Sequence, residues 1–176
     1  MLTFSGFLRH GSFRDLSVEI AGAFCGVFHG VITSGEFMLL ETYEITRKTS
    51  SGTDILDITG EVAGCVEQSG VSNGWVVVFV PGSTAGLTTI EYESGVVEDL
   101  RDAIERSAPI DMPYAHDARW GDGNGYSHVR AALMGPSLYV PVGGGRLCLG
   151  TWQQIVLCDF DNRPRTRRIV VQAGGL

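Results

Sequence analysis

Cysteine is scarce in this sequence, and its spacing limits what the chain can bind. The four cysteines are scattered singly through 176 residues, and no two of them form a C-x-x-C pair. This spacing argues against a structural zinc site, because such sites take their ligands from closely spaced pairs. We therefore expect free thiols and a location in the reducing cytoplasm, with the two cysteines that lie in apolar runs packed in the core. The four are Cys25, Cys65, Cys148 and Cys158, of which the last two lie in apolar runs.

An excess of positive charge and a long apolar run are also missing. The net charge of −7 argues against a nucleic-acid partner, which requires a basic face. No apolar run reaches the length that a membrane span needs, so no membrane partner is expected. One local basic cluster is interpreted as the solvated end of a strand, with a phosphate contact as the alternative because arginine matches phosphate geometry. It consists of Arg163, Arg165, Arg167 and Arg168.

The composition indicates a globular chain of one ordinary domain, with 44% hydrophobic and 19% charged residues. Residues 1–37 differ from the rest, because they carry six phenylalanines without a helical or strand period. We interpret them as an N-terminal extension, disordered or the product of a reading frame that starts upstream of Met38. The domain proper is then expected over residues 38–176.

Hydrophobic periodicity predicts more strands than helices. Alternation predicts strands over 39–50 and 87–93, and a continuous apolar run predicts a strand buried on both faces over 75–80. A glycine turn at 143–145 predicts a hairpin between 138–142 and 146–160, followed by a last strand over 167–172. Helices are expected after Asp57, with Thr59 as N-cap and Gly70 as stop, over 96–107, and over 127–134. This order favours an α+β fold of packed antiparallel sheets, sandwich-like, with two or three helices.

The segment 114–128 is the candidate site. It holds His116 and His128, with Asp122 six residues from each, and it has no apolar period that would place it in the core. Two imidazoles and one carboxylate suit a divalent ion, Zn²⁺ or Mg²⁺, with water as a further ligand. Histidine also titrates near neutral pH, so acid–base catalysis by the same residues is an equal alternative.

Further candidates lie outside this trio, each with a plainer alternative. Ser83 and Thr84 follow a buried strand and suit phosphate binding, although an ordinary turn explains them as well. Arg130 is a candidate phosphate partner or a surface ion pair. Glu91, Asn124 and Gln153 are candidate substrate contacts, with surface exposure or helix capping as the alternatives for the first two. Trp152 is expected in the core.

Several motifs resemble the YjbQ family, whose members are also called secondary thiamine-phosphate synthases. The longest is SLYVPVGGGRLCLGTWQQI at 137–155, and the resemblance extends over residues 40–174. Shorter matches are DIT at 57–59, VPGSTA at 80–85, YAH at 114–116, DGNG at 122–125 and SHVRA at 127–131. Many relatives have a histidine where this chain has Gly82. The Gly-Ser-Thr of this chain resembles an archaeal-type branch of the family, and the absence of the histidine removes one possible ligand or base.

The resemblance implies a fold of packed antiparallel sheets and a homotrimer with polar clefts between subunits. It also implies a transferase that couples a pyrimidine diphosphate to a thiazole phosphate and releases pyrophosphate. In that interpretation His116, Asp122 and His128 hold a divalent ion or move protons, and Ser83, Thr84 and Arg130 hold phosphate. The alternatives are a non-catalytic trimeric binding protein for a phosphorylated metabolite or metal ion and, from the His/Asp spacing alone, a metal-dependent hydrolase.

Overall fold

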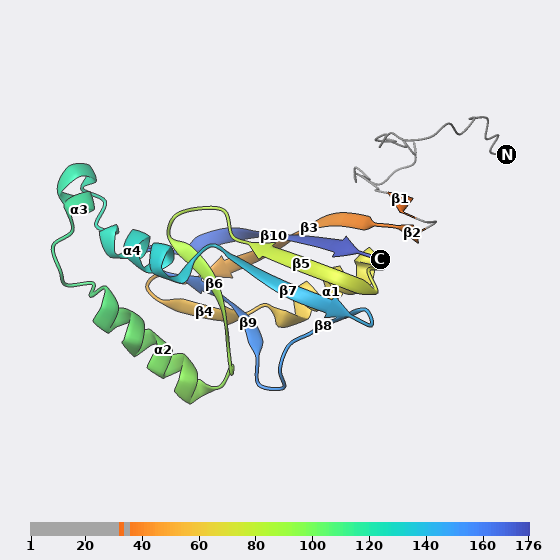
Figure 1. Ribbon diagram of the computed structural model, residues 1–176. Helices are drawn as coiled ribbons and strands as arrows, with labels where there is room; N and C mark the ends of the chain where they lie inside the picture. Colours follow the sequence, from red (N-terminus) through yellow and green to blue (C-terminus); the bar gives the residue numbers. More distant parts are fainter. Residues whose placement is uncertain (1–31, 34–35) are drawn as a thin grey trace.

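Two antiparallel sheets form the framework of the protein, whose computed structural model describes residues 32–33 and 36–176. The larger sheet has the order β3-β10-β5-β7-β8, and the smaller one has the order β4-β9-β6 (Figure 1). The interpretation of residues 1–37 falls mostly outside the described residues. Within them, only the two-residue strands β1 (Ile32–Thr33) and β2 (Glu36–Phe37) are described, and they pair with each other.

The larger sheet is built around its two longest strands, β3 (Leu39–Thr49) and β10 (Arg165–Gly175), which pair along their whole length. β5 (Asn73–Phe79) pairs with the second half of β10 and with β7 (Ser137–Gly143). β7 turns into β8 (Arg146–Leu147) through Gly144 and Gly145, whose φ angles of 58° and 73° suit the left-handed turn of a tight hairpin. The predicted glycine turn is therefore confirmed, but the single strand expected over 146–160 is wrong: β8 ends at Leu147, and residues 154–159 form a strand of the smaller sheet.

The smaller sheet has β9 (Gln154–Asp159) at its centre, between β4 (Asp54–Asp57) and β6 (Ala85–Ile90). Ile155 and Leu157 of β9 face the larger sheet in the main hydrophobic cluster. Val156 and Cys158 face the other way, into a second cluster that includes α2 (Ser94–Ser107) and α4 (Gly125–Met134). β9 is thus buried on both faces, because helices cover the side that the larger sheet does not.

The prediction that the strand beginning at Trp75 is buried on both faces is wrong. Val76 and Val78 are fully buried, whereas Trp75 and Val77 are only partly covered and Phe79 is 39% exposed. Strand residues alternate between faces, and in the described chain no helix covers the outer face of the larger sheet. The continuous apolar run at 75–80 therefore belongs to a strand whose second face is apolar but uncovered.

The helix α1 (Thr59–Ser69) begins and ends close to the predicted residues. Gly70 ends it in the left-handed conformation, with φ of 71°. Thr59 is its first helical residue and not its N-cap: the Thr59 hydroxyl donates to Asp57 and accepts from the backbone N–H of Ile155. This hydroxyl consequently ties the start of the helix to the smaller sheet.

The predicted α+β fold class is confirmed. The described part of the chain has four helices, whereas two or three were expected. The additional helix is α3 (Ala115–Trp120), which lies with α2 and α4 at one end of the molecule (Figure 1). Two predicted core residues are exposed, since Trp152 is 70% exposed and Cys148 lies in the loop after β8. None of the described helices is long and apolar enough to cross a membrane.

Candidate functional site

The predicted site segment folds as two short helices with a turn between them. α3 carries His116, α4 carries His128, and residues 121–124 join the helices. Gly121 ends α3 in the left-handed conformation, with φ of 70°, which reverses the chain. The two histidines thereby face each other across the turn, with ring centroids 4.4 Å apart and planes inclined by 32°.

His116 also meets two carboxylates. Its Nδ1 lies 3.2 Å from Oδ1 of Asp122 and 3.5 Å from Oδ1 of Asp117. Neither approach has hydrogen-bond geometry, so Nδ1 is a buried polar atom without a hydrogen bond to the described residues. A buried polar atom needs a partner, and one between two carboxylates suits a proton or a cation.

Three of these side chains could share one ion. Ligand atoms of His116, Asp117 and Asp122 all lie within 4.8 Å of one another, whereas His128 does not join this group. The structure therefore brings the predicted histidines and acid together but offers a donor set of one imidazole and two carboxylates. A site with two carboxylates suits Mg²⁺ or Mn²⁺, whereas zinc favours a site with more nitrogen ligands.

Asp117 is the residue that sequence reasoning missed. It follows His116 directly in a segment for which no helix was predicted, and the prediction was built on the spacing of His116, Asp122 and His128. Its Oδ1 accepts a hydrogen bond of 2.8 Å from the backbone N–H of Gly125, the first residue of α4. Asp117 thus joins the two helices as well as lining the site, and its place directly after His116 was the available signal.

The turn between the helices is fixed from two sides. The Asn124 amide, oriented with its nitrogen toward the acid, lies 3.2 Å and 3.3 Å from the two oxygens of Asp122. Asn124 is at the N-cap position of α4 but makes no capping hydrogen bond, so it orients the acid instead. On the other side, Asn162 donates to the backbone carbonyl of Asp122 at 2.8 Å.

Arg130 has its partners inside the fold. Its guanidinium donates to the carbonyl of Ala108, the hydroxyl of Thr53 and the carboxylate of Glu105, and it lies 4.9 Å from the ring centroid of Tyr126. The side chain is 1% exposed. This position ties α4 to the end of α2 and leaves little access for a phosphate.

Of the two hydroxyl residues after β5, only one is accessible. Ser83 is exposed, whereas Thr84 is buried and its hydroxyl donates to Asp161 and accepts from Arg167. The arginine cluster is likewise only partly solvated: Arg165 and Arg167 pair with Asp161 and Asp159, both fully buried. Asp159 and Asp161 were not predicted as partners of these arginines, because they belong to no motif with a known spacing.

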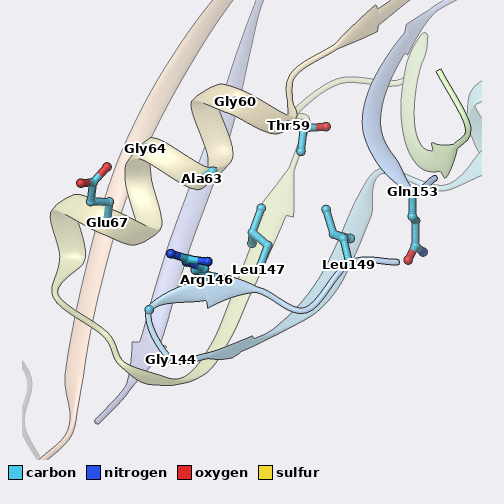
Figure 2. A pocket seen from close by; sticks show the side chains of 11 residues that line it. Thr59, Gly60, Ala63, Gly64, Glu67, Gly144, Arg146, Leu147, Leu149 and Gln153 are labelled. Atoms are coloured by element: carbon cyan, nitrogen blue, oxygen red, sulfur yellow. The ribbon is translucent and has the colours of Figure 1, made fainter. Parts of the chain in front are cut away.

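Glu91 and Gln153 lie away from the histidines. Glu91 is exposed just beyond β6. Gln153 accepts from the backbone of Gly150, donates to Thr89, and lines a hollow of about 650 Å³ between α1 and the β8 strand (Figure 2). No residue of 114–128 lines that hollow, so it is separate from the His116 cluster.

Comparisons with known proteins agree on one family. The family described as UPF0047 protein YjbQ-like matches residues 43–175. A UPF0047 protein of Archaeoglobus fulgidus is 42% identical over 130 residues, 74% of this chain and 98% of the relative. The UPF0047 protein YugU of Bacillus subtilis is 35% identical over 138 residues, 78% of this chain and all of the relative.

Solved structures give the same result. A YbjQ-like protein of unknown function from Sulfolobus solfataricus superposes with a TM-score of 0.75 at 32% identity, covering 79% of this chain and 99% of that one. A YjbQ/UPF0047 protein from Clostridium acetobutylicum gives a TM-score of 0.69 at 36% identity, with 74% and 98% covered. The resemblance inferred from the motifs at 57–59, 80–85, 114–131 and 137–155 is therefore confirmed, and the chain belongs to the YjbQ-like UPF0047 family.

Proposed function

We propose that the protein is a transferase that couples a pyrimidine diphosphate to a thiazole phosphate, forming thiamine phosphate and releasing pyrophosphate. The bond between the pyrimidine methylene carbon and the diphosphate oxygen breaks with its electron pair on the oxygen. A new bond forms from that carbon to the thiazole nitrogen. The reaction therefore needs groups that stabilise the departing diphosphate and place the two heterocycles in line.

The observation that carries this proposal is the convergence of His116, Asp117, Asp122 and His128 at the α3–α4 turn. A carboxylate pair beside a buried imidazole nitrogen would hold Mg²⁺, and Mg²⁺ when bound would neutralise the charge of the leaving diphosphate. His128 is not one of the three candidate metal ligands, so its imidazole is available to donate a hydrogen bond or a proton to the leaving oxygen of the diphosphate.

The donor set supports this proposal over a zinc-dependent hydrolase. Two of the three ligands are carboxylates, which are hard and suit an ion such as Mg²⁺ that arrives with a phosphorylated substrate, and only one is an imidazole of the kind that zinc prefers. Stoichiometric zinc in purified protein would favour the hydrolase, because a transferase supplied with Mg²⁺ would lose its ion on dialysis.

We also propose that the molecule acts as a homotrimer in the cytoplasm on a phosphorylated small molecule, without nucleic-acid or membrane partners. The open outer face of the larger sheet supports self-association: Trp75 stacks on Tyr139 at 5.8 Å, and Tyr139 is 64% exposed. Exposed apolar surface of this kind marks interaction sites. The free thiols of Cys65, Cys148 and Cys158 suit a reducing compartment.

The proposal is tested by incubating the full-length protein with both phosphorylated precursors and Mg²⁺ and measuring pyrophosphate. We expect release that requires both precursors, because pyrophosphate leaves only when the thiazole attacks. Release from the pyrimidine diphosphate alone would indicate a hydrolase. No release, with saturable Mg²⁺ binding, would favour the non-catalytic binding protein.

A further inference from the structure

A buried ion-pair network lies between the two sheets, where β9 ends and β10 begins. Arg165 and Arg167 lie two residues apart on β10 and so share the face that carries Ile169 of the core. They meet Asp159 and Asp161, both of which are 0% exposed. Burying two carboxylates costs several kcal/mol per ion unless the pairing is close and complete.

Asp159 holds the guanidinium of Arg167 in one orientation. Nε of Arg167 donates to Oδ2 at 2.6 Å, and Nη2 donates to Oδ1 at 2.6 Å and to the Thr84 hydroxyl at 2.8 Å. Asp159 accepts two further bonds, from the hydroxyl of Thr49 and the backbone N–H of Asp161. The pair is therefore fixed by the fold, and the side chain of Arg167 is only 10% exposed.

Nη1 is the one nitrogen of Arg167 that makes no hydrogen bond to the described chain. It borders the turn after β5, at a distance of 3.6 Å from where a Cβ of Gly82 would lie. Gly82 has φ of 123°, which side chains rarely adopt, so the backbone there stays bare beside the guanidinium. The next residue, Ser83, is exposed and carries a hydroxyl.

The same network contains an unsatisfied acceptor. Oδ1 of Asp161 is buried without a hydrogen-bond partner among the described residues, whereas Oδ2 accepts from Thr84 and Arg165. Buried carboxylate oxygens are normally paired, so this oxygen awaits a donor such as water or a ligand hydroxyl.

We propose that Nη1 of Arg167 and the turn at Gly82–Ser83 form an oxyanion site that binds a phosphoryl group. A guanidinium held on one edge by a carboxylate presents its other N–H groups in a fixed direction, which suits phosphate. The bare backbone of Gly82 leaves space for the ligand beside the guanidinium, and the exposed Ser83 follows it in the turn. This inference rests on the proposed function only in naming the ligand as part of a phosphorylated substrate. Arg167 takes the phosphate-binding role that was predicted for Arg130, whose guanidinium is occupied by partners inside the fold.

The test is the binding of inorganic phosphate and of pyrophosphate to the full-length protein, by calorimetry, without metal or precursors. Ser83→Asp places a negative charge at the exposed position next to Gly82, and Ser94→Asp, which adds the same charge at the exposed start of α2, is its control. We expect saturable binding in the wild-type protein, about tenfold weaker or lost binding in Ser83→Asp, and a change of less than about threefold in Ser94→Asp. Tighter binding of pyrophosphate than of phosphate would assign the site to the diphosphate, and the reverse order would assign it to the monophosphate.

A second variant tests Arg167 itself. Asp159→Asn combined with Arg167→Gln removes both charges together, which avoids leaving a buried carboxylate unpaired. Arg168→Gln is the control, because Arg168 is an exposed neighbour paired with Glu44. We expect the double variant to keep its circular dichroism spectrum and lose phosphate binding, while the control binds normally.

Two results would overturn the inference: no saturable anion binding in the wild-type protein, or equal binding in Ser83→Asp. If the double variant fails to fold, the comparison of Ser83→Asp with Ser94→Asp alone decides. Pyrophosphate release from the two precursors without anion binding at this turn would remove the oxyanion site and leave the transferase. Anion binding without release would remove the transferase and leave the site.

Discussion

The imidazole rings of His116 and His128 lie 4.4 Å apart, although one belongs to α3 and the other to α4. Two helices of 6 and 10 residues are too short to hold such a geometry by themselves. The bond from Gly125 to Asp117 and the contact of Asn162 with the turn join them. The site thus depends on the close approach of the two helix ends.

Replacing Gly125 with alanine is predicted to disrupt this approach. A Cβ there would lie 2.5 Å from Cβ of Tyr114, which is closer than real contacts. We expect Gly125→Ala to lower the free energy of unfolding by about 1–3 kcal/mol, as overpacking does. Urea denaturation measures this loss.

Gly64→Ala is the matched control for that substitution. Gly64 lies inside α1, and a methyl group added there would have nothing within 4 Å, so alanine should stabilise the helix by about 0.5–1 kcal/mol. Equal effects of the two substitutions would show that the approach at Gly125 is not tight.

Asp117→Asn is predicted to weaken divalent-ion binding by at least about tenfold, because asparagine keeps a hydrogen-bond acceptor for Gly125 but loses the charge. Calorimetric titration with Mn²⁺ measures the affinity. Asp111→Asn, at an exposed position before α3, should bind as the wild-type protein does. Unchanged affinity in Asp117→Asn would return the metal site to the two histidines and Asp122.

Arg130→Lys is predicted to affect stability and not anion binding. Lysine cannot reach Ala108, Thr53 and Glu105 together, so a buried acceptor loses its donor at a cost of about 1–3 kcal/mol. Phosphate affinity should stay within about twofold of the wild-type value. A stable variant with weakened phosphate binding would show that Arg130 binds the ligand after all.

The fold could be predicted from the sequence where a single local pattern decided the structure. The glycine turn at 144–145, the strand from Leu39 and the stop at Gly70 were of this kind. Burial was harder, because an apolar run such as 75–80 does not show whether a second layer covers it. Which strand is covered follows from the arrangement of the whole chain, in which α2 and α4 cover one face of β9 while one face of β5 stays uncovered.

The site was predictable in part for the same reason. His116, Asp122 and His128 lie within 13 residues, so a local fold brings them together. Arg167 and Asp159 come from two different sheets, and the hydrogen bond from Arg167 to the Thr84 hydroxyl joins residues 83 apart in sequence. Spacing along the chain contains no signal for such a network.

The stability of the Asp159–Asp161 network should depend on pH. Burial would raise the pKa of the Asp161 carboxyl, but hydrogen bonds from Arg165 and Thr84 and the charges of Arg165 and Arg167 outweigh it, and the pKa lies below its ordinary value. The ionised carboxyl therefore stabilises the fold above the unfolded-state pKa of about 3.9, and this contribution is lost as the pH falls through the lower folded-state pKa.

The measurement is the difference in unfolding free energy between the wild-type protein and Asp161→Asn. We expect the wild-type protein to be more stable by about 1.5–3 kcal/mol at pH 7, and the difference to shrink as the pH falls below 4. A difference that stays constant down to pH 3 would mean that the Asp161 pKa is not lowered by its partners.

The most direct test of the central claim is the rate of pyrophosphate release by His128→Ala with both precursors and Mg²⁺. His128 faces His116 but is not one of the three candidate metal ligands, so the variant should keep its fold and the Mn²⁺ affinity of the wild-type protein. We predict a rate lower by about 10²–10⁴-fold, as for loss of a general acid, with Val129→Ala on the same helix as an active control. A rate equal to that of the wild-type protein would contradict the account, because the paired imidazoles would then take no part in the reaction.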